Sequence, residues 1–151
     1  MRDSIATSRF LLGISIVMYV VSLFFAGFHS DRGTTQGWEA LLEGFMPAIF
    51  GVIGIFRFDF TYFGTISWLA NSAIALAWLL AALKVYKGAM GSSAAAIFLG
   101  LLFLTVNTIP IPDAQTMSSI HAGVGYYLWL GSMFFALMSG AALDPATQEN
   151  A

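Results

Sequence analysis

Long stretches without a charged residue restrict what this chain can fold into more than any other feature. The three longest cover residues 60–83, 88–112 and 114–143, which is 24, 25 and 30 residues. Another, from Phe10 to Phe28, has 19 residues. A helix rises about 1.5 Å per residue and needs about 20 residues to cross a hydrocarbon core about 30 Å thick. Each of these four runs is therefore long enough to be a membrane-spanning helix.

The composition indicates the same surroundings. Hydrophobic residues make up 58% of the 151 residues and charged residues only 9%, whereas a soluble domain carries about 25% charged residues. The mean hydropathy is +0.81. The net charge of −2 gives no sign of a nucleic-acid partner, and the absence of cysteine excludes disulfides, thiolate metal sites and cysteine nucleophiles. We therefore expect a protein whose main partner is the lipid bilayer.

We predict a single all-α membrane-embedded helical bundle over residues 1–151. Its four spanning helices are expected at about 10–28, 62–84, 92–110 and 119–142. The first run exceeds the roughly 7–15 apolar residues of a signal-peptide core, so it is interpreted as a retained helix. A fifth run, 44–56, has only 13 residues and reaches about 20 Å as a helix. We expect a short re-entrant or interfacial helix at 38–56, with five spanning helices as the alternative.

The positions of lysine and arginine favour four spans over five. Cytoplasmic loops close to span ends are enriched in these residues. With four spans and a cytoplasmic N-terminus, four of the six positive residues lie inside and two outside; with five spans the division is three and three. We therefore expect both termini in the cytoplasm and residues 29–60 on the opposite side of the membrane.

Residues 34–47 carry several signals of a helix that starts at the membrane interface. Thr34 or Thr35 can cap its first turn. Glu39 falls where a carboxylate meets the positive end of the helix dipole, and Glu43 lies one turn further on the same face. Pro47 then interrupts the hydrogen-bond ladder. Dipole and solubility roles explain the two carboxylates, and a cation or proton site is the sharper alternative.

Small residues at helical spacing predict close packing between helices. In lipid, helices associate largely through small residues that let their backbones approach. The two predicted packing stripes are Ala70, Ala73, Ala77 and Ala81 in one run and Gly125, Ser132, Ala136 and Gly140 in another. Trp38, Trp68 and Trp129 are expected to act as anchors at the membrane interface, where the amphipathic indole ring is favoured.

A few polar side chains in or near the apolar runs form a candidate polar site. His29 ends the first run and His121 begins the last, so both should lie at the outer face, where two histidines can ligate haem or a metal. Asn71 is the most interior polar residue, and it either fixes packing by an interhelical hydrogen bond or lines a polar path. Glu39 and Glu43 complete the site. Interfacial hydrogen bonding explains both histidines without a ligand, and we expect neither a bound metal nor a cofactor.

Three segments occur in a recognisable order. They are GWEALLEG at 37–44, WLAN at 68–71 and GYYLWLGS at 125–132. Together they resemble a group of small uncharacterised bacterial inner-membrane proteins that carry G-W-E-A-L after the first helix, W-L-A-N-P at a middle helix and Y-x-W-L in the last; Ser72 stands where the group has proline. The resemblance implies a bacterial inner-membrane location and no established activity. Its signature residues would be Trp38, Glu39, Trp68, Asn71, Tyr127 and Trp129.

The sequence favours a non-enzymatic membrane protein that packs against itself or a partner, such as an accessory subunit or an immunity-type protein. It contains no phosphate loop, zinc motif or nucleophile elbow that would indicate an enzyme, and no catalytic residue is assigned. One alternative is a small transporter or channel with a polar path near Glu39, Glu43, Asn71 and His121. Another is a haem or quinone redox protein that uses the two histidines.

Overall fold

The computed structural model describes residues 2–31, 33–58, 63–105, 108–110 and 117–142, and these are mostly helical. The bundle is formed by α1 (Arg2–Ser22), α4 (Ala70–Ala82), α5 (Tyr86–Leu102) and α6 (Val124–Ala141). Helix α4 continues from the 3-10 segment η1 (Phe63–Leu69), and the two together form one long helical segment. The remaining helices are α2 (Gly37–Glu43), α3 (Phe45–Arg57) and the 3-10 segment η2 (Phe103–Thr105). The mainly helical fold agrees with the all-α prediction.

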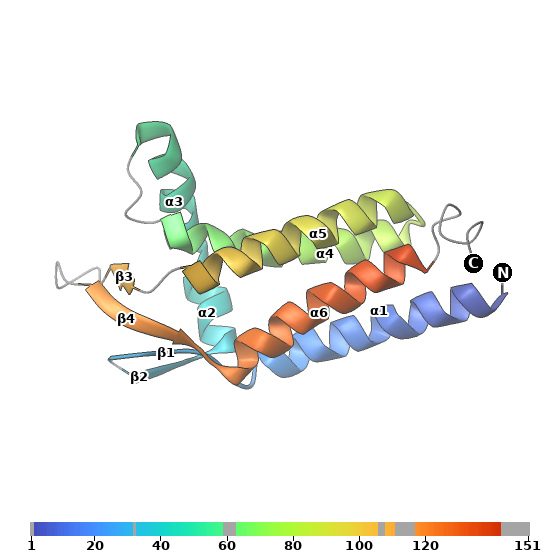
Figure 1. The fold of residues 1–151 in the computed structure, drawn as a ribbon, viewed down its shortest axis with the longest axis horizontal. Coiled ribbons are helices and arrows are strands. Elements are labelled where there is room, and N and C mark those ends of the chain that lie inside the picture. The colour runs from blue at the N-terminus through green and yellow to red at the C-terminus, as the bar shows by residue number, and fades with distance from the viewer. Residues whose placement is uncertain (1, 32, 59–62, 106–107, 111–116, 143–151) are drawn as a thin grey trace.

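The four long helices lie alongside one another in a bundle (Figure 1). Helix α6 runs between α1 and α5, and α5 pairs with α4. Four segments are long and apolar enough to cross a membrane: Ser4–Ser22, Gly64–Ala82, Tyr86–Thr105 and Val124–Ala141. The first helix begins near the N-terminus, and the last ends close to it at the same end of the bundle (Figure 1). An even number of passes along the bundle requires this arrangement.

The helix bounds differ from the predicted spans at several ends. Helix α1 begins at Arg2 and α5 at Tyr86, earlier than the predicted starts at 10 and 92. A long basic side chain near a helix end can place its charge at the interface while its stem covers apolar surface, so Arg9 and Lys87 need not end a helix. The last helix was expected from 119, yet it begins at Val124, because the residues before it form a strand.

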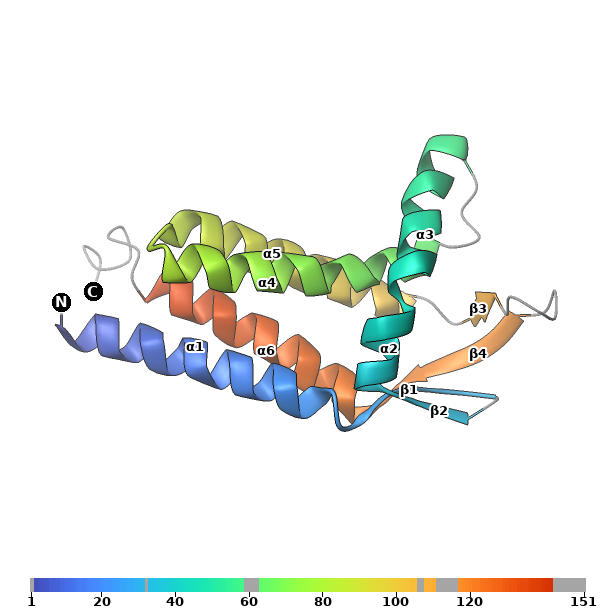
Figure 2. The ribbon, with the colours of Figure 1, turned by 180° about the vertical axis from the view of Figure 1, so that it is seen from behind.

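Helices α2 and α3 lie across the bundle rather than along it (Figures 1 and 2). The two helices meet at Gly44 with a bend of 52°. Pro47 explains the break, since its ring clashes with the carbonyl four residues earlier, at Glu43, where α2 ends. Pro47 itself lies in the first turn of α3, where a missing N–H costs nothing. The pair lies at the end of the bundle away from the termini. Taken together as one bent segment, α2 and α3 are also long and apolar enough to cross a membrane, so the alternative of five spans stays open.

A small antiparallel sheet, which the sequence did not predict, extends beyond this end of the bundle (Figure 1). Its strands are β1 (Ala26–Ser30), β2 (Gly33–Gln36), β3 (Thr108–Pro110) and β4 (Met117–Ala122), in the order β2-β1-β4-β3. Strand β1 continues from α1, and β4 leads into α6. The sheet therefore joins α1 and α6 at the end of the bundle that lies away from the chain termini, which we call the outer end.

The bundle core is small and built from compact side chains. Its buried cluster consists of Ala70, Ile74, Ala96, Met133 and Ala136, contributed by α4, α5 and α6. Tyr19, Trp78 and Trp129 pack against this cluster from the side. Small residues at the centre let the backbones approach, and the aromatic rings fill the remaining space between helices.

Candidate functional site

The seam between α1 and α6 is lined by a repeat of serine and glycine. Three positions on each helix face each other, and both sets step by seven residues. The pairs are Ser8 with Ser139, Ser15 with Ser132, and Ser22 with Gly125. All six residues are buried. A seven-residue repeat keeps one seam in register between two packed helices, so this seam runs nearly the whole length of α1.

Hydrogen bonds across the seam join side chains to backbone carbonyls. Ser8 Oγ donates to the Ser139 carbonyl at 2.8 Å, and Ser139 Oγ donates to the Ser8 carbonyl at 2.9 Å. Ser15 Oγ donates to the Ser132 carbonyl at 2.7 Å. At the outer end, a Cβ on Gly125 would lie 2.8 Å from the Ser22 carbonyl oxygen. This contact admits only glycine without movement of the backbone.

A polar cluster around Asn71 joins three helices near the outer end of the bundle. The Asn71 Oδ1 atom accepts from Tyr19 Oη on α1 at 3.0 Å and from Trp129 Nε1 on α6 at 2.8 Å. Its Nδ2 donates to the Trp68 carbonyl at 3.0 Å. Both lone pairs of the amide oxygen are thus used. These contacts fit the interhelical packing role for Asn71 and leave its oxygen no capacity for a ligand.

A second link lies one to two helical turns further into the bundle. Trp78 Nε1 on α4 donates to Ser15 Oγ at 2.9 Å, and the same serine donates to the Ser132 carbonyl. The ring of Trp78 packs edge-on against that of Tyr19, with centroids 5.2 Å apart. Helices α1, α4 and α6 are therefore tied together at two levels by hydrogen bonds that are mutually satisfied.

The two glutamates of the candidate polar site have different surroundings in the structure. Glu39 Oε2 accepts the backbone N–H of Gln36 at 2.7 Å, which completes a capping box at the start of α2. The helix cap is Gln36, so the predicted cap at Thr34 or Thr35 was wrong; both threonines lie in β2. Glu43 is exposed at the end of α2. Glu39 thus stabilises a helix start, as the dipole interpretation expected.

The two histidines, by contrast, are brought directly together. His29 on β1 and His121 on β4 are paired residues in the antiparallel register. Both side chains are exposed, and His29 Nδ1 lies 2.9 Å from Thr34 Oγ1 on the neighbouring strand β2. Of the candidate polar residues, Asn71 thus lies in a closed cluster, Glu39 caps a helix, Glu43 is exposed, and the two histidines are paired on the sheet. The transporter interpretation stays a prediction.

The two predicted packing stripes face the inside of the bundle. Ala70 and Ala77 are buried, and Ala73 and Ala81 are half-buried. All four members of the second stripe, Gly125, Ser132, Ala136 and Gly140, are buried. These residues form contacts within the chain itself.

Of the three predicted anchors, only Trp38 is largely exposed, at the start of α2. Trp68 lies in η1 and its Nε1 donates to the Leu41 carbonyl at 2.8 Å, which ties η1 to α2. Trp129 points into the bundle toward Asn71. Two of the three rings thus act in intramolecular contacts that sequence position alone did not distinguish from interfacial ones.

Helix α3 has a small-residue face and a large apolar surface. Ala48, Gly51 and Gly54 are its buried residues, and they face η1. Thr65 Oγ1 of η1 donates to the Pro47 carbonyl at 2.7 Å. The exposed large apolar residues of this segment are Phe45, Met46, Phe50, Ile53, Ile55, Phe56 and Phe58. Phe56 is 82% exposed, so this helix presents its bulkiest side chains to its surroundings.

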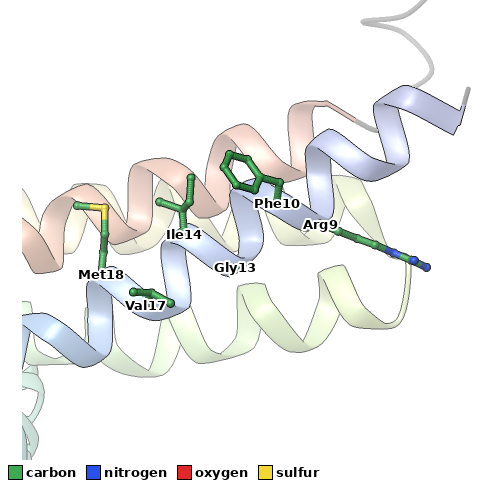
Figure 3. Close-up of a pocket in the computed structure, with 6 residues that line it drawn as sticks. All are labelled: Arg9, Phe10, Gly13, Ile14, Val17 and Met18. Carbon is green, nitrogen blue, oxygen red and sulfur yellow. The ribbon is translucent and has the colours of Figure 1, made fainter.

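A shallow, open depression of about 490 Å³ lies on α1 (Figure 3). Its lining comes from one helix and is apolar apart from Arg9; the other residues are Phe10, Gly13, Ile14, Val17 and Met18. Among the described residues, no group of three or more histidine, aspartate or glutamate side chains could hold a metal ion.

Comparison with known proteins adds no relative. The chain matches no protein-family model, no curated protein and no solved structure. The resemblance to small bacterial inner-membrane proteins therefore rests on its three short segments, and it stays a prediction.

Proposed function

We propose that the chain is an integral membrane protein of the bacterial inner membrane with four spans and both termini in the cytoplasm. In the four candidate spans, only 11–39% of the residues are buried inside the structure. The remaining surface includes Phe10, Val17 and Phe24, which are 69%, 61% and 74% exposed. Continuous apolar surface on this scale is unfavourable in water, and a bilayer would cover it.

The charges of the bundle support this orientation. Lys84 and Lys87 lie at the connection between α4 and α5, at the same end of the bundle as the termini (Figure 1). Arg9 lies in the half of α1 nearest that end. Positive residues gather on the cytoplasmic side of membrane proteins. The transverse α2–α3 pair and the sheet then lie at the outer face, with α3 in the plane of the interface.

Within the membrane, the proposed role is non-enzymatic: the protein packs against a helix of a neighbouring membrane protein, as an accessory subunit or an immunity-type protein would. The observation that carries this proposal is the exposed apolar surface of α3. This helix is attached to the chain by its small-residue face and directs Phe50, Ile53 and Phe56 outward. Because the other small-residue stripes are occupied inside the bundle, α3 is the contact surface we propose.

Site-specific photo-crosslinking in native membranes tests this role. A photoreactive residue at Phe56 is expected to give one or a few protein adducts of defined mass, whose identification distinguishes a second copy from another protein. The same residue at Leu79, which is 55% exposed on α4, serves as the lipid-facing control and should give lipid adducts alone. Lipid adducts alone at both positions would show that α3 is only a membrane anchor and contradict the docking role.

A further inference from the structure

The chain has only two histidines, and the fold places them opposite each other. They are far apart in the sequence, yet they are paired residues of β1 and β4. Directly opposed residues of an antiparallel pair have Cβ atoms about 4.5–5.5 Å apart and project from the same face of the sheet. His29 and His121 are therefore neighbours with parallel side-chain directions.

The face that carries this pair is the open face of the sheet. Each histidine is more exposed than the residues next to it: Phe28 and Ser30 are half-buried around the exposed His29, and Ile120 is buried beside the exposed His121. Phe28 packs toward Phe103 of η2, with ring centroids 6.0 Å apart. The strands extend beyond the end of the bundle (Figures 1 and 2), so the two imidazoles are accessible to ions in solution.

Thr34 orients one of the two rings. His29 Nδ1 lies within hydrogen-bond distance of the Thr34 hydroxyl, at 2.9 Å, and the two residues are paired across β1 and β2. With Nδ1 engaged, Nε2 is the nitrogen left for another partner. A hydrogen bond to the second ring nitrogen is the usual way in which proteins fix the orientation and tautomer of a metal-ligating histidine.

We propose that His29 and His121 together bind one divalent first-row transition-metal ion, with Cu²⁺ bound most tightly. Imidazole nitrogen is a preferred ligand of these ions, and Cu²⁺ forms the strongest complexes in the series. Two nitrogens in adjacent positions, each about 2.0–2.1 Å from the ion, lie about 2.9 Å apart in square-planar geometry and about 3.3 Å apart in tetrahedral geometry. Side chains on opposed residues can reach either separation. The remaining coordination positions belong to water.

The geometry favours a metal ion over haem for this pair. Two histidines on one face of a sheet approach an ion from the same side and take adjacent positions around it. Haem with two axial histidines needs them on opposite faces of its ring. Asp31, in the turn between β1 and β2, accepts from the backbone N–H of Ser119 at 2.9 Å and from its hydroxyl. Among the described residues, the proposed site thus has two protein ligands, His29 and His121.

Titration of Cu²⁺ into the detergent-solubilised protein, purified without a histidine tag, tests the proposal. Visible absorption and electron paramagnetic resonance should show one nitrogen-ligated Cu²⁺ per chain. Because both rings hold the same ion, His29→Ala and His121→Ala are each expected to lower the affinity at least about tenfold, and the double variant should bind little worse than either single one. The chain has no cysteine to compete for the ion.

Adjacent threonines provide a matched control. Thr34→Val removes the hydroxyl beside His29 and should weaken binding by about tenfold, the lower end of the effect of losing such a partner. Thr35→Val changes the neighbouring, half-buried residue of the same strand and should leave binding unchanged. If each single histidine variant kept half the stoichiometry at native affinity, the two histidines would be independent ligands. Native affinity in the double variant would show adventitious binding only. Either result would overturn the proposal.

Discussion

The α1–α6 seam and the α3–η1 contact are built from the same kind of residue but have different roles. Each places small side chains where two segments meet: Ser8, Ser15 and Ser22 in the seam, and Ala48, Gly51 and Gly54 on α3. In the seam, small residues of the opposing helix pack against these side chains, and hydrogen bonds join the two helices. On α3, only the small-residue face packs against the chain, and large apolar side chains are exposed.

This difference separates residues that stabilise the fold from residues whose side chains are exposed to lipid or to another protein. Substitutions in the seam remove contacts that no lipid or partner can replace, because the site is closed inside the bundle. Phe56, on the outer surface of α3, is 82% exposed, so its substitution removes little contact within the chain. Stability should therefore report on the first region, and association with another protein should report on the second.

The largest effect is expected for Gly125→Leu. A side chain there meets the carbonyl oxygens of Phe25, Ala26 and Ser22 at 2.7–2.8 Å from its Cβ. Overpacking a closed site costs about 1–3 kcal/mol, and a clash with backbone should place this variant at the upper end or above. Unfolding by a denaturing detergent, followed by circular dichroism, measures the loss. Gly91→Leu, where no atom lies within 4 Å of the added Cβ, should unfold like the native protein.

Asn71→Ala should have the next largest effect. It removes the acceptor shared by Tyr19 and Trp129 and leaves two donors without a partner. Hydrogen bonds between membrane helices are worth about 0.6 kcal/mol on average and at most about 1.7, so we expect a loss of about 1–2 kcal/mol. The exposed neighbour Ser72→Ala provides the control. Equal stability of the two variants would mean that the cluster contributes nothing to holding the helices together.

A double-mutant cycle at Ser8 and Ser139 should detect a smaller, specific coupling. The two hydroxyls exchange hydrogen bonds with each other's backbone carbonyls and lie 3.1 Å apart. We expect an interaction energy of about 0.6 kcal/mol from denaturing-detergent titrations of the single and double Ser→Ala variants. Strict additivity would show that the two hydroxyls act independently and that close backbone packing alone closes this end of the seam.

The smallest effect on stability is expected for Phe56→Ser. Its ring is 82% exposed, so the free energy of unfolding should change by less than about 0.5 kcal/mol. Crosslinking to the proposed neighbouring protein from a probe at Phe50 should nevertheless fall severalfold. A large loss of stability without a change in crosslinking would reverse the assignment of α3 as a contact surface.

The arrangement of passes along the bundle was accessible from the sequence. Runs without charge located all four long helices, and the shortness of the run at 44–56 predicted that it would not lie along the others. Pro47 and Gly44 gave the reason for its break. Helix ends were less accessible because Arg9 and Lys87 lie inside helices, where charge was taken as a boundary.

The sheet could not be predicted from the sequence because the local pattern of its residues indicates other structures. Phe24 to Phe28 extend the apolar run of α1, and Ser118 to Ala122 lead into that of α6, so local pattern assigned both to helices or loops. Strand pairing between β1 and β4 is a contact between residues far apart in sequence. No local signal specifies such a pairing unless one face alternates clearly, and these strands are too short to show it.

The candidate site was predicted in part. Glu39 was correctly placed at a helix start, and the two histidines were correctly expected at one end of the bundle. Gly125 and Ser132 were predicted as packing residues, but the other serines of the seam were missed. They carried a signal: Ser8, Ser15 and Ser22 are spaced by seven, as are Gly125, Ser132 and Ser139. Two such repeats in separate runs could have predicted the antiparallel pairing, whereas a search for stripes at spacings of three and four could not.

The partnership of the first and last helices also sets an order of assembly. In the proposed membrane location, Ser8, Ser15 and Ser22 enter the lipid before their counterparts on α6, because α6 follows them in the chain. Until then the hydroxyls can bond only within their own helix, as Ser22 does to the Tyr19 carbonyl at 2.6 Å. A nascent chain interrupted before residue 124 would therefore carry an unmatched polar stripe in the bilayer, a mark by which membrane proteases could recognise an unfinished product.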